Sequence, residues 1–363
     1  MEGLELTVVS AQFWSGRRVL VTGHTGFKGS WLSLWLHSLG AETHGLALDP
    51  PTDPSLFEVA SIGELLASDQ RVDIRYAEDV RAAVRHVAPE FVFHLAAQPL
   101  VRASYDIPIE TYATNVMGTA HVLEALRGVD SVRVAVSITT DKVYENFERS
   151  GGYREDEPLG GYDPYSSSKA AAELVTAAYR RSFLAGQGVA VATARAGNVI
   201  GGGDWAVDRL VPDALAAFAQ GRAVEIRNPS AVRPWQHVLE PLSGYILLAE
   251  RLSDGSGDFS EAWNFGPDAD DAMPVRDIIE RIAALWGDGA SWIAADGEHP
   301  HEAGLLGLDA GKAAARLGWR PRWNLDDALA ATVAWQRSYL AGESPRATTL
   351  RQIAAYEASR AVD

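Results

Sequence analysis

The sequence of 363 residues contains no cysteine, and basic residues are in the minority, with 32 lysines and arginines against 48 acidic residues. Without cysteine, disulfides, thiolate metal sites and thiol nucleophiles are excluded. The net charge of −16 argues against general affinity for nucleic acid or an anionic membrane surface, because both require a basic field. No segment reaches the length of a membrane helix, and Met1 to Trp14 lack the pattern of a secretion signal, so we expect a cytoplasmic protein.

Short apolar runs alternate with longer amphipathic ones from Arg17 to about Ala196. This alternation predicts an α/β fold, namely a doubly wound parallel sheet of the Rossmann type with helices on both faces. The expected strands are residues 17–22, 43–48, 91–95, 132–138 and 189–194, and the expected helices are residues 28–39, 79–87, 108–126 and 165–184.

Beyond Gly201 the pattern changes to helices, short strands and loops rich in glycine and proline. This change predicts a smaller, mixed α/β cap that binds the substrate. We therefore divide the chain into a larger domain at residues 14–200, a cap at residues 201–345 and a C-terminal tail at residues 346–363. Some strands and helices of the cap region are expected to return to the larger domain, and the tail is expected to be a loosely held helix.

A glycine-rich turn follows the first predicted strand, with Gly23, Gly26 and Gly29 three residues apart. The first glycine permits a tight turn, the second lets backbone N–H groups approach a pyrophosphate, and the third lets the helix pack closely. The helix N-terminus adds a partial positive charge that suits an anion. A purely structural turn is the alternative, but the position directly after a strand favours a dinucleotide cofactor, with Thr25 and Phe27 beside it.

Asp49 lies twenty residues after Gly29, at the end of the second predicted strand. A carboxylate there can accept hydrogen bonds from both ribose hydroxyls and repels a 2′-phosphate, which favours NAD over NADP. The alternative is a turn aspartate before the two prolines that follow it. Asp73 and Ile74, which follow the third strand, are expected near the adenine.

Tyr165 and Lys169 lie one helical turn apart at the start of a predicted helix, so their side chains share a face. A free phenol has a pKa of about 10, and stabilising its anion near neutrality requires roughly 3–4 kcal/mol, which a neighbouring ammonium and a nicotinamide cation can supply. A surface helix pair is the alternative. Thr140, at the end of the preceding strand, favours catalysis because its hydroxyl can bridge the tyrosine and a substrate hydroxyl.

Several motifs together resemble the extended short-chain dehydrogenase/reductases that act on nucleotide sugars. These are the glycine turn, His94-Leu95-Ala96-Ala97-Gln98, Asn115 in a Thr-Asn-Val-Met-Gly-Thr segment, and Tyr165-x-x-x-Lys169. The longer segments 21–32, 161–165, 196–205 and 227–238 are similar to those of the CDP-glucose 4,6-dehydratase family. The resemblance extends from about Trp14 to Trp323.

The resemblance implies that NAD oxidises carbon 4 of the hexose, that water is eliminated across carbons 5 and 6, and that hydride returns to carbon 6. Tyr165 would be the base at carbon 4, Thr140 its relay and Asp141 the acid at carbon 6. By the same resemblance, Leu95, Ala96, Ala97 and Asn115 contact the cofactor together with Tyr165 and Lys169, whereas Gln98, Asn198, Arg209, Arg233 and His301 contact CDP-glucose. It also implies a homodimer formed through helices 108–126 and 165–184.

Lys142 departs from the related enzymes that act on dTDP-glucose, many of which carry a glutamate there as the carbon 5 base. A lysine is cationic at neutral pH, and Asp141 beside it favours that charge. Lys142 then either steers an enolate or a bound water electrostatically or loses its proton after desolvation. The remaining alternative is an exposed Asp141–Lys142 ion pair on a loop, which would contribute little to stability.

Other functions and other roles for individual residues stay open at this stage. A nucleotide-sugar 4-epimerase would share the Tyr/Lys pair but needs no acid at Asp141, and a non-catalytic NAD-binding scaffold is a further alternative. Arg209 can equally be a helix cap, and His237 can equally be a core histidine. His299, His301 and Glu302 suggest a metal site, but no distant ligand set accompanies them, so we expect no metal.

Overall fold

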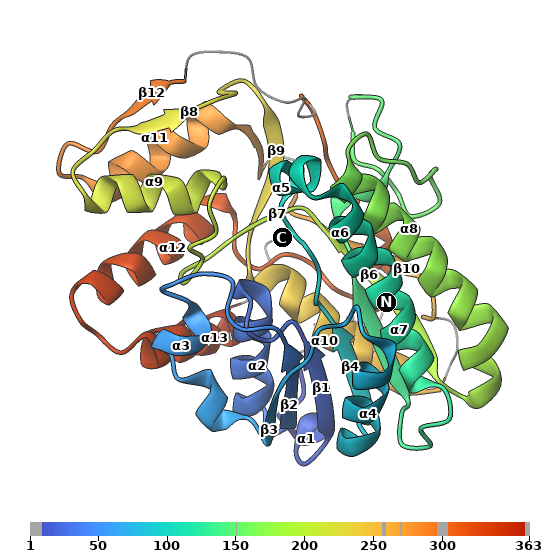
Figure 1. Ribbon diagram of the computed structural model, residues 1–363. Helices are drawn as coiled ribbons and strands as arrows, with labels where there is room; N and C mark the ends of the chain where they lie inside the picture. Colours follow the sequence, from blue (N-terminus) through green and yellow to red (C-terminus); the bar gives the residue numbers. More distant parts are fainter. Residues whose placement is uncertain (1–8, 150, 256–258, 269–270, 296–303, 360–363) are drawn as a thin grey trace, which may run out of the picture.

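The computed structural model describes residues 9–149, 151–255, 259–268, 271–295 and 304–359 (Figure 1). Its centre is a seven-stranded sheet in the order β10-β6-β5-β4-β1-β2-β3, in which every neighbouring pair is parallel. The strands are β1 (Arg18–Thr22), β2 (Glu42–Ala47), β3 (Ser68–Arg71), β4 (Phe91–His94), β5 (Val134–Ile138), β6 (Ala190–Ala196) and β10 (Ala262–Phe265). The sheet confirms the predicted Rossmann-type α/β fold.

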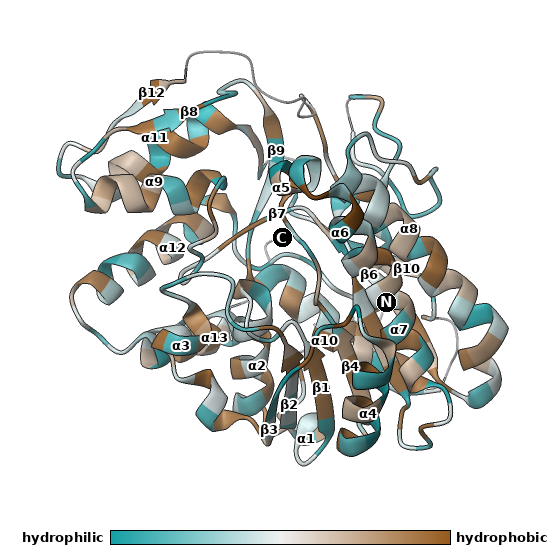
Figure 2. Cartoon of the chain, viewed as in Figure 1, coloured by the Kyte–Doolittle hydropathy of each residue, from teal (hydrophilic) through white to brown (hydrophobic). Residues whose placement is uncertain are grey.

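Both faces of the sheet are buried, because successive residues of each strand point to opposite sides. In β1, Val19 and Val21 lie in one apolar core and Leu20 in another. The first core is covered by α2 (Phe27–Ser38), α10 (Leu239–Ser253) and α13 (Pro345–Ala358), and the second by α4 (Ala77–Val87), α7 (Gly118–Leu126) and α8 (Pro164–Tyr179). Strands buried on both sides read as continuous apolar runs, and β1 and β4 are brown in Figure 2.

Two of the predicted long helices contain a wider, π-helical turn. The helix expected at residues 108–126 consists of α6 (Pro108–Tyr112), a π segment (Ala113–Met117) and α7. The helix expected at residues 165–184 consists of α8 and a π segment (Arg180–Leu184). The start of α8 is fixed by Asp163, whose side chain accepts from the backbone N–H of Ser166, and by Pro164 in the first turn.

Two short sheets lie apart from the large sheet, and the part of the chain that builds them is called the smaller domain here. One has the order β11-β9-β7 and the other pairs β12 with β8. The elements that build it are β7 (Asn198–Ile200), α9 (Leu210–Ala219), β8 (Val224–Ile226), β9 (Val232–His237), β11 (Ala272–Pro274), α11 (Val275–Trp286), β12 (Trp292–Ala294) and α12 (Leu325–Leu340). The remaining helices are α1 (Ala11–Trp14), α3 (Leu56–Val59) and α5 (Val101–Asp106). Between β9 and β11, the chain returns to the large sheet with α10 and β10.

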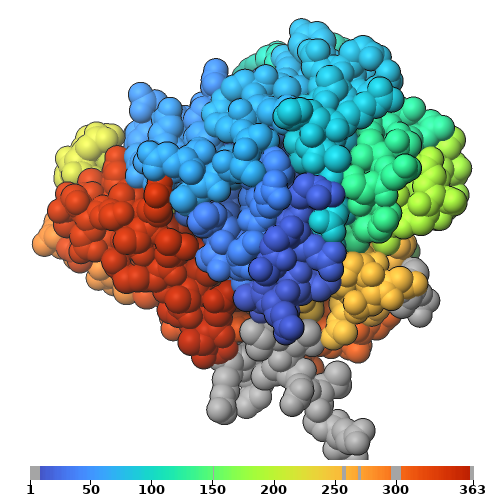
Figure 3. Space-filling view, turned by 90° about the horizontal axis from the view of Figure 1, so that it is seen from below, coloured from blue at the N-terminus to red at the C-terminus, as the bar shows by residue number. Residues whose placement is uncertain are grey.

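The C-terminal helix differs from the expectation of a loosely held tail. α13 packs against α2 and α12, and Tyr356 is fully buried. Its hydroxyl donates to Oε2 of Glu240 at 2.6 Å, so a hydrogen bond to α10 anchors this helix. In Figure 3, the red C-terminal segment lies directly beside the blue N-terminal one. Among the described residues, no helix has the length and apolar character needed to cross a bilayer.

Candidate active site

A cavity of about 1110 Å³ lies at the carboxyl ends of the central strands, facing the smaller domain. This is the usual ligand position in open α/β sheets. All the predicted site residues that the structure describes line the cavity, except Asn115. His301, with His299 and Glu302, lies outside the described residues. Within the described part of the chain, no group of three metal-ligating side chains comes together.

The glycine turn shows why side chains are excluded at two of its positions. Gly23 has a φ of +75°, and a Cβ there would lie 2.7 Å from the backbone nitrogen of Ala96. A Cβ on Gly29 would lie 2.1 Å from the carbonyl oxygen of Gly23. At Gly26, by contrast, the only close atom is 3.4 Å away, so its backbone is open to the cavity. The turn therefore fits the pyrophosphate of a dinucleotide.

The two predicted nucleoside-binding carboxylates already have arginine partners. Asp49 is largely exposed and accepts from Nε of Arg71 at 3.0 Å. Asp73 accepts from Nη2 of Arg75 at 2.6 Å, and hydrogen bonds with Arg75 lower the pKa of Asp73. Both remain on the cavity wall, and Ile74 lies beside them. Thr25, also on the wall, donates its hydroxyl to the carbonyl oxygen of Leu48.

Asn115 does not reach the cavity wall, which corrects the expectation of a direct cofactor contact. It is 1% exposed, and its Oδ1 accepts from the backbone N–H of Gln98 at 2.8 Å. Its Nδ2 donates to the carbonyl oxygen of Gln98 and to Oγ of Ser168 on α8. Asn115 thus joins the loop Leu95–Gln98 to the helix that carries Tyr165. The side chain of Gln98 is itself bonded to Leu100 and Thr111.

Thr140, Asp141 and Tyr165 are brought together at the end of β5. Thr140 donates its hydroxyl to Oδ1 of Asp141 at 2.9 Å and is hydrogen-bonded to the side chain of Tyr165. Asp141 is 1% exposed, and within the described residues its Oδ2 has no hydrogen-bond partner. Burial raises the pKa of Tyr165 to about 12, although the Thr140 hydrogen bond acts against this shift. The chain alone therefore keeps the phenol protonated.

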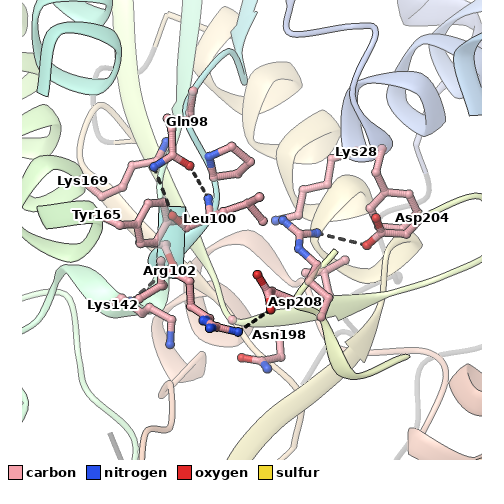
Figure 4. Close-up of a pocket in the computed structure, with 18 of the residues that line it drawn as sticks. Lys28, Gln98, Leu100, Arg102, Lys142, Tyr165, Lys169, Asn198, Asp204 and Asp208 are labelled. Atoms are coloured by element: carbon pink, nitrogen blue, oxygen red, sulfur yellow. Dashed lines mark hydrogen bonds and ion pairs between the residues drawn. The ribbon is translucent and has the colours of Figure 1, made fainter. Parts of the chain in front are cut away.

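Two lysines face this centre from opposite sides of the cavity (Figure 4). Lys169 donates from Nζ to the carbonyl oxygen of Ile138 at 3.1 Å, and burial lowers its pKa to about 8. Lys28 lies in the first turn of α2. Burial and the nearby charges of Arg209 and Lys169 lower its pKa to about 7. Lys142 is half-buried and also lines the cavity, so it is not simply an exposed loop residue.

A buried network of charged side chains lies next to the catalytic centre formed by Thr140, Asp141 and Tyr165. Glu173 on α8 accepts from Nε and Nη2 of Arg195, at 2.9 and 3.0 Å. The same carboxylate accepts from the hydroxyls of Thr139 and Thr193. Arg195 also donates to the hydroxyl of Tyr144, which lines the cavity. Thr139, which precedes Thr140, is thus hydrogen-bonded to a buried ion pair.

The smaller domain contributes the remaining charges. Arg209 pairs with Asp204 at 3.0 Å, and Arg233 is buried on β9, where it donates to the carbonyl oxygen of Val232. Asn198 also lines the cavity and is drawn close to Asp208 in Figure 4. Asp208 pairs with Arg102 of the larger domain at 2.6 Å.

His237 is buried outside the cavity, where its ring packs against Trp31 and Trp323. Burial lowers its pKa to about 3, so it is a core histidine.

Sequence reasoning did not select several charged residues of the cavity wall. These are Lys28, Arg102, Asp204, Asp208, Asp213 and Arg227. Lys28 lies between Gly26 and Gly29 of the glycine turn, so its position could have indicated that its side chain lines the site. The others come from α5, from the first turn of α9 and from the cap loops, where no spacing rule indicated which side chains turn inward.

A Rossmann-type sheet, a glycine turn open to a dinucleotide and a buried Thr-Tyr-Lys arrangement define a short-chain dehydrogenase/reductase. Residues 20–332 match the family model described as GDP-mannose 4,6 dehydratase. The chain belongs to this family of nucleotide-sugar dehydratases.

Two of three similar proteins are 4,6-dehydratases, and the third is an epimerase of the same fold. The chain is 53% identical over 354 residues to a CDP-glucose 4,6-dehydratase from Salmonella typhimurium, covering 96% of this chain and 98% of that one. A crystal structure of a dTDP-glucose 4,6-dehydratase from Streptomyces venezuelae, with NAD bound, has a TM-score of 0.75 at 27% identity, covering 91% of this chain and 99% of that one. A UDP-glucose 4-epimerase from Thermus thermophilus, in complex with NAD, has a TM-score of 0.76 at 25% identity, covering 88% and 99%.

Proposed function

We propose that this protein dehydrates CDP-glucose to CDP-4-keto-6-deoxyglucose with NAD as its cofactor. The high identity to a CDP-glucose 4,6-dehydratase over nearly the whole length of both chains supports this activity. Within the site, the main support is the environment of Asp141. This carboxyl group is buried beside Tyr165, and its Oδ2 has no partner in the described structure. An epimerase would need no acid at this position, whereas the elimination of water does.

The residues on the cavity wall fit NAD. Gly26 leaves room for a pyrophosphate, Gly23 and Gly29 allow the tight turn around it, and Asp49 after β2 can accept from the ribose hydroxyls. Lys169 is placed to hold the second ribose. Bound NAD would supply the hydride acceptor for the oxidation of carbon 4 and, once reduced, the hydride donor for carbon 6.

Tyr165 acts as the base for the carbon 4 hydroxyl. Its pKa of about 12 has to fall before it can do so near neutral pH, and positive charge beside the phenol lowers it. Lys169 supplies such a charge from one helical turn away. Thr140 is hydrogen-bonded to both Tyr165 and Asp141, so it can relay a proton between the substrate hydroxyl and the phenol.

Asp141 acts as the acid at carbon 6, where a departing hydroxyl needs a proton. Its burial and its unbonded Oδ2 leave this oxygen available to the substrate. Lys142 follows it on the same wall, where it orients a water molecule that carries the carbon 5 proton to solvent and stabilises the negative charge that then develops on the carbon 4 oxygen. Arg233, Arg209 and Asn198 bind the substrate pyrophosphate, and guanidinium groups suit its geometry.

Incubation of the purified protein with CDP-, dTDP-, UDP- and GDP-linked glucose tests the proposal. We expect the CDP-linked sugar to lose water and form a keto sugar, which mass spectrometry detects. Tyr165→Phe is the control, because it keeps the ring but removes the base. Loss of water from none of the four sugars would contradict a dehydratase, and an isomer of unchanged mass would indicate an epimerase.

For the assembly we propose a homodimer in the cytoplasm, where NAD and nucleotide sugars are available. Exposed apolar side chains on the two helices expected to pair support the dimer. They are Ile109, Met117 and Leu174, which are 81%, 51% and 62% exposed. The variant Ile109→Glu should shift the mass measured by light scattering from two chains to one, and an unchanged mass would argue against this interface.

A further inference from the structure

Residues of α9 and β8 line one part of the cavity, which we call the slot. Its walls are mainly apolar, and they are formed by Val211, Leu215, Val224 and Ile226. Arg209 lines the same cavity as Tyr165 and directly precedes α9, so it connects the catalytic centre with the slot. A nucleotide sugar has its hexose, pyrophosphate and base in line. With the hexose at Tyr165 and the pyrophosphate at Arg209, the base falls in the slot.

The slot contains a half-buried carboxyl group that has no partner among the described residues. Asp213, in the first turn of α9, is half-buried and lines the cavity. Among the described residues, no hydrogen bond or ion pair involves its side chain, whereas Asp204 and Asp208 are each paired with arginine. Burial and the charge of Asp208 raise the pKa of Asp213 to about 6. Arg227 is the nearby cation, but it is bound to Asp208.

An unpaired carboxylate in an apolar slot costs free energy, because burial removes its water without supplying a donor. A flat pyrimidine ring suits the apolar walls, and its polar edge can supply the donor. Cytosine carries an amino group at position 4, which a carboxylate can accept from, whereas uracil and thymine carry a carbonyl oxygen there. That carbonyl oxygen and the carboxylate would repel each other, because both carry negative charge and neither can donate a hydrogen bond.

Building on the proposed function, we propose that Asp213 determines the choice of base, by accepting a hydrogen bond from the 4-amino group of cytosine and excluding uracil and thymine. Its place in the slot, its lack of another partner and the apolar walls around it are the grounds. The role concerns specificity only, because Asp213 lies on the cap and not at the reacting carbons.

The test compares the binding of CDP, UDP and dTDP to the NAD-loaded full chain by calorimetry at pH 8, where Asp213 is ionised. The variant Asp213→Asn preserves shape but adds an amide that can donate to a carbonyl oxygen. We expect it to reduce the preference for CDP over UDP by about tenfold or more, since a good base contact discriminates by ~1–3 kcal/mol. Asp213 has no partner to lose, so the fold should not change.

Glu225 on β8 provides the matched comparison, because it also lines the cavity but is exposed. The same loss of preference in Glu225→Gln, with none in Asp213→Asn, would overturn the assignment. Measuring the dehydration of nucleotide-linked glucose by the wild type distinguishes an error in the role of Asp213 from an error in the proposed function. Wild type that dehydrates CDP-glucose while Asp213→Asn keeps the full CDP preference refutes only the role of Asp213. Wild type that dehydrates no nucleotide-linked glucose refutes the function itself.

Discussion

The variant Glu173→Gln should destabilise the protein more than its nearly unchanged shape suggests. Glu173 and Arg195 are 4% and 3% exposed, and the carboxylate accepts four hydrogen bonds, from Arg195, Thr139 and Thr193. Glutamine retains one acceptor oxygen and turns an NH₂ group toward donors. The guanidinium of Arg195 would then be buried without its counter-charge.

Removing one partner of a buried ion pair costs about 3–5 kcal/mol, because the remaining charge stays desolvated. We therefore expect the free energy of unfolding, measured by urea denaturation, to fall by this amount in Glu173→Gln. Activity should fall as well, since Thr139 loses its acceptor and adjoins Thr140 in the catalytic centre. This loss of activity should already be measurable without urea, where the variant is still folded.

Glu124→Gln is the matched control. Glu124 lies on α7 and pairs with Arg127, with side chains 38% and 37% exposed. Water screens this pair, so its removal should cost less than about 0.5 kcal/mol. The reasoning would be refuted if the two variants lost the same small amount of stability.

Three further predictions concern other parts of the molecule. Asp141→Asn should slow water loss far more than carbon 4 oxidation, measured by deuterium transfer from carbon 4 to the cofactor; equal slowing of both steps would contradict its role as the acid. Gly29→Ala should abolish NAD binding in a fluorescence titration, because its Cβ would lie 2.1 Å from the Gly23 oxygen; unchanged affinity would show that the turn can widen. Burial raises the pKa of Glu240 from 4.5 to about 7. Its contribution to stability is therefore present below pH 4.5 and lost as the pH rises through 7, by about 3 kcal/mol. Urea unfolding at several pH values should show this slope, and Glu240→Gln should lack it.

The parts of the site that were predictable are local in sequence. The glycine turn and the Tyr165–Lys169 pair follow from spacing within one element, and both lie on the cavity wall as expected. The role of Asp141 was implied by the family resemblance, and the residue lies shortly after the end of β5. In each case, the backbone geometry of a single segment determines where the side chain points.

The parts that were missed depend on contacts between distant segments. Asn115 carries the right residue type, but it bonds to Ser168 and Gln98, so it braces the site and does not line it. The burial of the C-terminal helix depends on Tyr356 meeting Glu240, which is 116 residues away. The raised pKa of Asp213 depends on its burial and on Asp208, and both depend on how the segments of the cap pack together. Periodicity within one segment does not reveal such partners.

The position of β10 affects how the chain folds during synthesis. This strand pairs with β6 along Ala262–Phe265, yet the cap elements β7, α9, β8 and β9 come between the two strands in sequence. The larger domain therefore cannot complete its sheet until about 65 residues beyond Ile200 have left the ribosome, on the order of several seconds at typical rates of translation. Until then the edge of β6 is an unpaired template for another strand. A gene fragment ending at residue 200 should accordingly aggregate and not yield an independent nucleotide-binding unit.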